Sequence, residues 1–172
     1  MLSDHFMERY KWPLADTQSF RTDNFTTILG AELHAPATSL GEVWHILAAG
    51  LPLDFAPCGK DETAPHLARR AHAAGAFVAI AHPAWSHLTL EDAKTIDCAH
   101  AVEVYNNVCA KLYDRPDGWY LLEQILRDGR RLSAIACDDA HFRHDDQFGA
   151  WAHVKSETLE PASLVEALKR GH

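Results

Sequence analysis

Carboxylates and imidazoles at the ends of apolar runs are the residues of this sequence that can do chemistry. The densest group is AIACDDAHFRHDD, residues 134–146, where an apolar run leads into four aspartates and two histidines. Asp139 and His141 are two residues apart as the chain leaves this run, so both side chains can turn toward one point. Glu32 lies inside another apolar run, ILGAELHA, and a carboxylate is rarely buried there unless it is paired or bound to a metal.

Three histidines occupy similar places. His82 ends the run AIAH and precedes Pro83, which ends a strand, but alone it is equally well explained as a core histidine bonded to a main-chain carbonyl. His45 interrupts VWHILAA and alone is more typical of a structural residue. His34 lies two residues after Glu32, on the same face of an extended chain, and is expected to support a ligand.

Four other polar residues of 134–146 are not predicted to be metal ligands. Asp138 is predicted to be a loop or helix-capping group beside the functional pair. His144, Asp145 and Asp146 are predicted to lie in a solvated loop.

One glutamate, one aspartate and several histidines match the ligand sets that bind manganese, iron or zinc in hydrolytic sites. Two or three such ions about 3.5–4 Å apart would activate a bridging water and hold the oxygens of a displaced group. The sequence contains no Gly-x-Ser-x-Gly motif, no P-loop and no Rossmann glycine pattern, so no competing chemistry is indicated.

Strands and helices that position these residues alternate along the chain. Helices are predicted within 61–75, 89–96, 117–129 and 161–171, where Thr89 and Asp92 have the spacing of a capping box and glycines follow three of the helices. The predicted strands are nearly continuous in Ala, Val and Ile, as in parallel sheets covered by helices, and span 25–34, 42–49, 76–82, 101–105, 131–137 and 150–155. This order predicts an α/β barrel or layered α/β domain with its site at the carboxyl ends of the strands.

The composition limits the wider possibilities. A chain of 172 residues with 47% hydrophobic content suits one domain. Its formal net charge of −8, without a Lys/Arg block, gives no strong signal for nucleic-acid binding. The four cysteines form no Cys-x-x-Cys pair, and without an 18-residue apolar run or a secretory-type start we expect a cytoplasmic protein with no membrane partner.

Taken together, the motifs resemble the PHP (polymerase and histidinol phosphatase) metal-dependent hydrolases over essentially the full chain. LSDH (2–5) is similar to a Thr-Asp-His motif, LGAELHA (29–35) to a Gly-x-Glu strand, and WHILAAGL (44–51) to a His-bearing strand. AIAHP (79–83) is similar to a His-Pro motif and CDDAHF (137–142) to a Ser-Asp-Ala-His motif. HPAWSHLTLED, VEVYNN and DDAHF further resemble the branch that contains carbaryl-hydrolase-like proteins.

The resemblance implies two to three divalent ions in an intact member. It makes Glu32 a bridging ligand that completes one site with His45 and His82. Asp139 would serve a second ion, whose His-x-His pair comes from a first strand that this sequence lacks. His5 and His141 would serve a third ion.

The implied fold is α/β, an incomplete, distorted (β/α)7-type barrel lacking its first strand, with residues 1–172 as one partial domain. The chain is therefore expected to be truncated at the N-terminus and also at the C-terminus, and its exposed strand edges suggest a homo-oligomer.

The leading hypothesis is a phosphoesterase that uses a metal-activated water on a small, phosphorylated substrate. Asp139 and His141 are its predicted catalytic residues as well as ligands. Residues predicted to contact the substrate or support the ligands are His34, Lys60, Asn106 and Arg143. Two alternatives stay open: hydrolysis of an amide, carbamate or ester, with Trp85, Trp119 and Tyr105 lining an apolar pocket, and a truncated, inactive metal-binding domain.

Overall fold

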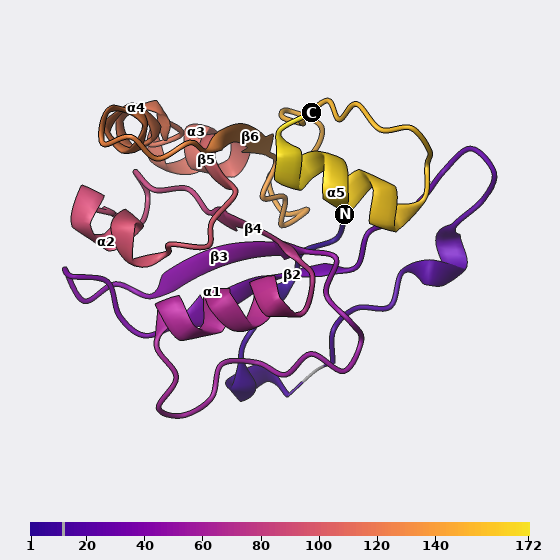
Figure 1. Ribbon diagram of the computed structural model, residues 1–172, viewed down its shortest axis with the longest axis horizontal. Coiled ribbons are helices and arrows are strands. Elements are labelled where there is room, and N and C mark those ends of the chain that lie inside the picture. The colour runs from indigo at the N-terminus through magenta and orange to yellow at the C-terminus, as the bar shows by residue number, and fades with distance from the viewer. Residues whose placement is uncertain (12) are drawn as a thin grey trace.

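The computed structural model describes residues 1–11 and 13–172, and within these ranges six strands form one sheet in the order β1 to β6. Figure 1 shows this sheet with helices on both sides. The strands are β1 (His5–Phe6), β2 (Gly30–Ala35), β3 (Trp44–Ala49), β4 (Phe77–Ile80), β5 (Ala101–Asn106) and β6 (Ser133–Cys137). Five of the six predicted strands are therefore present, and the mixed α/β class is confirmed.

The sheet is mixed, whereas the apolar runs predicted parallel pairing. β1 and β2 are parallel, as are β4, β5 and β6, but β3 is antiparallel to both β2 and β4. Residues 36–43 join β2 to β3 without a helix, and a connection this short allows only an antiparallel partner. The direction of β3 matters for the site, because its amino end lies beside the carboxyl end of β2.

The four predicted helices are confirmed. Thr89 and Asp92 form the expected capping box at the start of α2, with the Asp92 N–H donating to Thr89 Oγ1 over 3.1 Å and the Thr89 N–H donating to Asp92 Oδ2 over 3.1 Å. The helices are α1 (Ala64–Ala73), α2 (Leu90–Thr95), α4 (Trp119–Arg127) and α5 (Pro161–Arg170). Short 3-10 turns cover Glu8–Tyr10 and Gln18–Phe20.

The structure differs from the predicted elements at three places. Residues 150–155 form no strand: this segment has no regular secondary structure and no sheet partner, and Trp151 is 65% exposed. The helix α3 (Asn107–Tyr113) was missed, although Asn106 caps it by accepting a 2.8 Å hydrogen bond from the Cys109 N–H. The predicted strand at 25–34 begins only at Gly30.

The two faces of the sheet pack differently because side chains alternate along each strand. Leu33 and Ile46 point into the main core, which also holds α1 and α4. The opposite face carries Leu47, which packs in a smaller cluster with Val165 of α5. Figure 1 accordingly shows α1 and α5 on opposite sides of the sheet.

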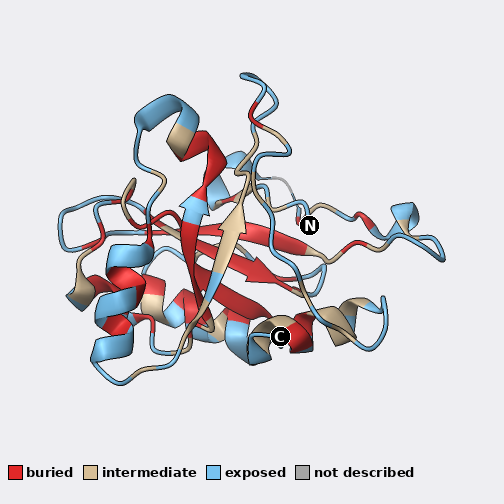
Figure 2. Ribbon diagram, turned by 90° about the horizontal axis from the view of Figure 1, so that it is seen from above, coloured by how far each residue is buried: buried red, intermediate tan, exposed pale blue. Residues whose placement is uncertain are grey.

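The outer strands differ in burial. Figure 2 shows buried central strands beside β6, whose residues are mostly half-buried. Within the described ranges β1 and β6 are not paired with each other, yet His5 Nε2 from β1 lies 3.3 Å from Nε2 of His141, which follows β6. The two ends of the sheet thus converge at one place, while closure into a barrel and the missing first strand stay predictions.

Candidate metal centre

A buried carboxylate surrounded by four imidazoles lies where the ends of the sheet converge. Glu32 is 4% exposed. Its Oε1 lies 2.8 Å from His45 Nδ1 and 3.0 Å from His82 Nε2. Its Oε2 lies 2.5 Å from His5 Nδ1 and 3.4 Å from His34 Nε2. Each oxygen of one carboxylate therefore faces two histidines.

Strand register explains this convergence. His5 of β1 is the direct partner of Glu32 in the parallel pair, and His34 is the direct partner of His45 in the antiparallel pair. Glu32 and His34 share a face because they are two residues apart. Active-site residues are expected at the carboxyl ends of strands, and His34 lies there on β2. His45 lies at the start of β3, but it reaches the same edge of the sheet because β3 runs in the opposite direction.

Several imidazole nitrogens lie within hydrogen-bond distance of other imidazole nitrogens, not of an oxygen. His5 Nδ1 and His34 Nε2 are 2.8 Å apart, and His45 Nδ1 and His82 Nε2 are 3.1 Å apart. Such pairs need a proton or a cation between them, because two bare nitrogen lone pairs repel. His34 Nδ1 is also buried with no hydrogen-bond partner among the described residues. This donor set fits a divalent cation.

The most compact ligand group differs from the predicted one. One atom from each of His5, Glu32, His34 and His45 lies within 4.8 Å of the others. His34, expected only to support a ligand, thus points directly into the cluster. His82 contacts Glu32 Oε1 beside His45, so the predicted trio of Glu32, His45 and His82 is also brought together.

The pKa values of Glu32 and the surrounding histidines are shifted by burial and by their contacts with one another. Burial would raise the pKa of Glu32, but hydrogen bonds from the four imidazoles hold it well below its usual range. Burial would lower the pKa of His82, but the nearby carboxylates, Glu32 first, raise it to about 9. The hydrogen bond to Glu32 raises the pKa of His5, while burial lowers that of His34. The carboxylate of Glu32 thus favours the protonated form of His5 and His82, while burial disfavours that of His34.

Asp139 joins the site from the segment after β6. Its φ of 53° is left-handed, a conformation that aspartate tolerates better than most residues. Its Oδ2 accepts a 3.1 Å hydrogen bond from Asn106 Nδ2, and its carbonyl accepts one of 2.8 Å from His141 Nδ1. Burial and then the charge of Glu32 raise the pKa of Asp139.

A further buried carboxylate, Glu103 on β5, was missed by the sequence analysis. It is 1% exposed, and its Oε2 accepts a 2.5 Å hydrogen bond from the His82 N–H. Asn106 Nδ2, which bonds Asp139, also lies 3.3 Å from both oxygens of Glu103. The carboxylate-in-an-apolar-strand argument that identified Glu32 applies equally to AVEVY and would have found it. Glu103 thus connects the segments that carry His82 and Asp139.

The segment after β6 is folded tightly around two other aspartates. Asp138 accepts three 2.7 Å hydrogen bonds from the N–H groups of residues 148–150, in keeping with its predicted loop role. Asp146 was predicted to be solvated, and that is wrong: it is fully buried and accepts hydrogen bonds of 2.9 and 3.0 Å from the N–H groups of His141 and Phe142. Its short side chain satisfies a turn that sequence spacing does not reveal.

A cavity of about 240 Å³ opens onto the cluster. Arg143 and His144 line it together with Trp85, Asp139 and His141. Its wall is completed by Val108, Cys109, Leu112 and Tyr113. The predicted substrate residue Arg143 is therefore at the site.

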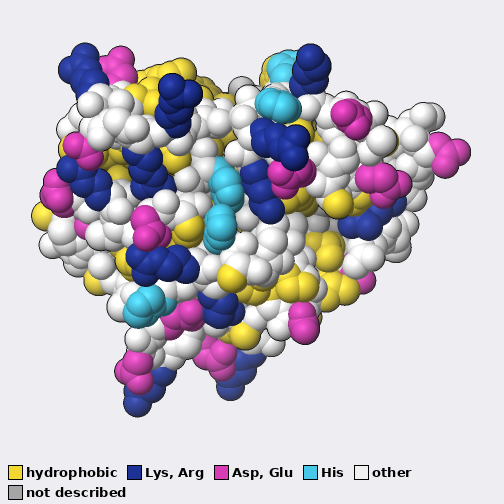
Figure 3. All heavy atoms as spheres, in the orientation of Figure 1, with side chains coloured by type: hydrophobic (Ala, Val, Ile, Leu, Met, Phe, Trp, Pro, Cys, Tyr) yellow, Lys and Arg dark blue, Asp and Glu magenta, His cyan; other side chains and the backbone are white. Residues whose placement is uncertain are grey.

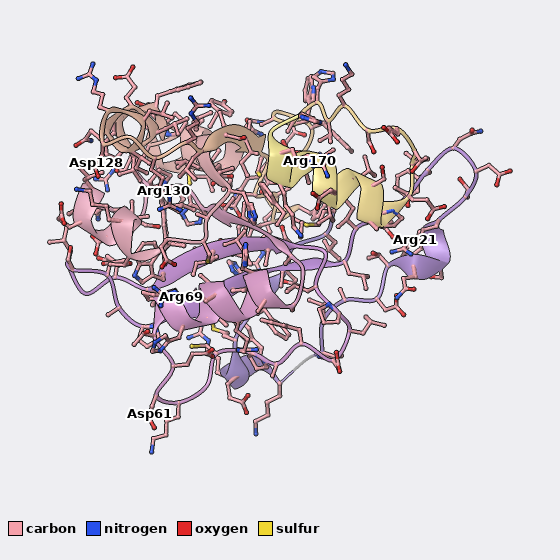
Figure 4. The ribbon with its side chains drawn as sticks, in the orientation of Figure 1. Arg21, Asp61, Arg69, Asp128, Arg130 and Arg170 are labelled. Atoms are coloured by element: carbon pink, nitrogen blue, oxygen red, sulfur yellow. The ribbon has the colours of Figure 1, made fainter. Side chains whose placement is uncertain are left out.

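Other predicted contacts lie elsewhere. Lys60 is exposed in the loop before α1 and is not among the described residues that line the cavity. Its neighbour Asp61 points away from the molecule at the tip of that loop (Figure 4). Tyr105 and Trp119 are 38% and 52% exposed and do not line the cavity either.

The surface adds two observations. On the face shown in Figure 3, Lys and Arg side chains alternate with Asp and Glu and form no continuous basic stripe. Among the helices of the described residues, none is long and apolar enough to cross a membrane.

Comparison with known proteins gives a likeness in fold. No protein-family model and no curated protein matches the chain. A crystal structure of a two-domain protein from Bacteroides vulgatus, which contains a predicted PHP-like metal-dependent phosphoesterase, superposes with a TM-score of 0.56 at 21% identity. The match covers 84% of this chain and 42% of the other, so this chain spans less than half of that protein. At this identity the likeness is one of fold alone.

Proposed function

We propose that the protein is a divalent-metal-dependent hydrolase that cleaves phosphoesters with a metal-activated water. The observation that carries the proposal is the burial of Glu32 among four imidazole nitrogens. A buried carboxylate that faces so many ring nitrogens is costly unless cations or protons compensate it. The PHP-like fold of the Bacteroides vulgatus protein supports the same class of reaction.

Glu32, His45 and His82 are the proposed ligands of one ion, of manganese, zinc or iron. His5, His34, Asp139 and His141 are the proposed ligands of one or two further ions. Bound divalent ions would supply a water of lowered pKa and positive charge for the reacting oxygens.

Side chains around the cluster are placed for proton transfer and for binding of the substrate. His141 Nδ1 donates to the carbonyl of Asp139, which directs Nε2 toward His5 Nε2, 3.3 Å away, where it can bind an ion or hold a proton. Asp139 is fixed by Asn106 at the same place. Arg143 and His144 line the cavity and would attract an anionic phosphoryl group. These positions suit proton transfer and substrate orientation.

Hydrolysis of a carbonyl ester, carbamate or amide is a second candidate. The apolar part of the cavity wall, where Trp85 and Tyr113 pack edge to face at 6.0 Å between ring centroids, favours it because a neutral substrate needs no cation. Substrate comparison separates the two candidates.

The test is metal content combined with turnover. Wild type and Glu32→Gln are loaded with manganese or zinc and desalted, and bound metal is measured by mass spectrometry. Glu91→Gln, which removes an exposed carboxylate on α2, is the matched control. We expect metal in wild type and the control, and a loss of affinity of at least about tenfold in Glu32→Gln.

The loaded proteins are then assayed with 4-nitrophenyl phosphate, bis(4-nitrophenyl) phosphate and 4-nitrophenyl acetate. Metal-dependent release from a phosphate substrate is expected. Metal-dependent release from the acetate alone would favour the carbonyl reaction, and undiminished metal binding by Glu32→Gln would contradict the proposed centre. Metal binding without any turnover would indicate the inactive metal-binding domain.

We further propose that the substrate is a small, phosphorylated molecule.

We also propose that the protein associates with itself through the outer strands of the sheet. The half-buried β6 has one neighbouring strand, β5, among the described residues, and an open strand edge can pair with another copy. Light scattering at several protein concentrations tests this, and a constant monomer mass would contradict it.

A further inference from the structure

A second, larger cavity reaches the same cluster from another side. Its volume is about 520 Å³, compared with about 240 Å³ for the cavity beside Asp139. His5, His45 and Trp85 line both cavities. A ligand whose reacting group lies at the cluster can therefore extend into the larger space.

Both cavities have mixed linings, but they hold different polar groups. The smaller one holds Asp139, His141, Arg143 and His144, so its polar groups suit the charged group that reacts. The larger one lies against the start of β3 and the turn Glu8–Tyr10, where its wall is mostly apolar and aromatic. Its apolar and aromatic members are Met7, Tyr10, Ala35, Pro36, Val43 and Trp85, and its polar members are Arg9, His34, Glu42 and the shared His5 and His45. The polar groups beside the cluster suit the charged group that reacts, and the apolar part of the larger cavity suits the rest of the substrate.

Flat groups dominate the larger cavity. Trp85 offers an indole, and the Arg9 guanidinium lies over the Tyr10 ring at 4.8 Å from its centroid while Nη2 donates a 2.9 Å hydrogen bond to Tyr10 Oη. Indole, phenol and guanidinium groups all stack favourably on planar rings. The thioether of Met7 also contacts aromatic rings favourably.

We propose that this larger cavity binds the leaving group of the ester and that this group is an aromatic ring. The inference rests on the proposed function, because it assumes that the reacting group lies at the Glu32 cluster. Val43, which is 47% exposed and lines the cavity just before β3, is the position from which a larger side chain would fill it.

The experiment measures binding of compounds that are not hydrolysed, so that it does not depend on turnover. Phenylphosphonate and methylphosphonate are titrated calorimetrically into the manganese-loaded protein. Val43→Trp fills the cavity, and Leu40→Trp is the matched control, because Leu40 is 65% exposed on the same loop and does not line the cavity. Circular dichroism and thermal unfolding establish that both variants are folded.

We expect wild type and Leu40→Trp to bind phenylphosphonate at least about tenfold more tightly than methylphosphonate, through burial of the ring. Val43→Trp should lower this ratio to near one without changing the affinity for methylphosphonate. Equal binding of the two compounds by wild type, or an unchanged ratio in Val43→Trp, would overturn the leaving-group pocket and leave the phosphoesterase proposal standing. Failure of wild type to bind either phosphonate would overturn both.

Discussion

Replacement of Glu103 by glutamine should make the stability of the protein less sensitive to pH. Glu103 is 1% exposed, and burial raises the pKa of its carboxyl to about 7, against an ordinary value of 4.5, although the charge of His82 acts in the opposite direction. Between these pH values the folded protein holds a proton that the unfolded chain has released. The group's contribution to stability is therefore complete below pH 4.5 and is lost as the pH rises through about 7.

The size of the effect follows from the two pKa values. The difference between 4.5 and about 7 corresponds to about 3 kcal/mol in the free energy of unfolding. Glutamine has no proton to lose, and its carbonyl can still accept the hydrogen bond from the His82 N–H. From pH 4.5 to pH 8, Glu103→Gln should therefore become about 3 kcal/mol more stable relative to wild type.

Urea unfolding followed by circular dichroism, with EDTA present and at several pH values, measures this difference. Glu91→Gln on the surface of α2 is the control, because it removes a carboxylate that is exposed to solvent in the folded protein. A difference between Glu103→Gln and wild type that stays constant from pH 4.5 to 8 would refute the reasoning, because Glu103 would then ionise alike in the folded and unfolded states.

Two other aspartates give separate predictions. Asp138→Ala removes the acceptor of three N–H groups of residues 148–150, so it should cost about 1–3 kcal/mol and speed proteolysis of this segment, whereas Glu157→Ala at an exposed position should change neither. Asp92→Ala should cost about 1–2 kcal/mol, because Asp92 both caps α2 and accepts 2.8 Å hydrogen bonds from the N–H and hydroxyl of Ser39. Although burial opposes it, these hydrogen bonds lower the pKa of Asp92, so the difference from wild type should be largest above pH 3.8 and should shrink as the pH falls through the folded-state pKa; a loss that is unchanged in acid would contradict this.

Local sequence was sufficient wherever short-range physics decides the structure. The capping box of Thr89 and Asp92 predicted the start of α2, because the hydrogen bonds that begin a helix lie within one turn. The isolated carboxylate of Glu32 in an apolar strand predicted a buried group that needs compensation, and it lies at the centre of the cluster.

Strand direction and loop folding depend on contacts between distant residues, and here the sequence was insufficient. Runs of Ala, Val and Ile are similar in parallel and antiparallel strands that are buried on both faces, so the composition of β3 did not reveal its reversal, and only the short interval 35–41 between the predicted strands indicated it. The segment 150–155 has an apolar pattern but finds no strand partner, since pairing depends on which sheet edge lies nearby.

The candidate site also has features that follow from local sequence and features that depend on tertiary contacts. The residue types and their places at strand ends determined that carboxylates and imidazoles would gather, because side chains two residues apart share a face. The tertiary structure alone decided that His34 points into the cluster, that Asp146 is buried under its own turn and that Glu103 links His82 to Asn106. Each of these depends on the register of neighbouring strands or on the path of a loop, and neither is encoded within a few residues of the side chain concerned.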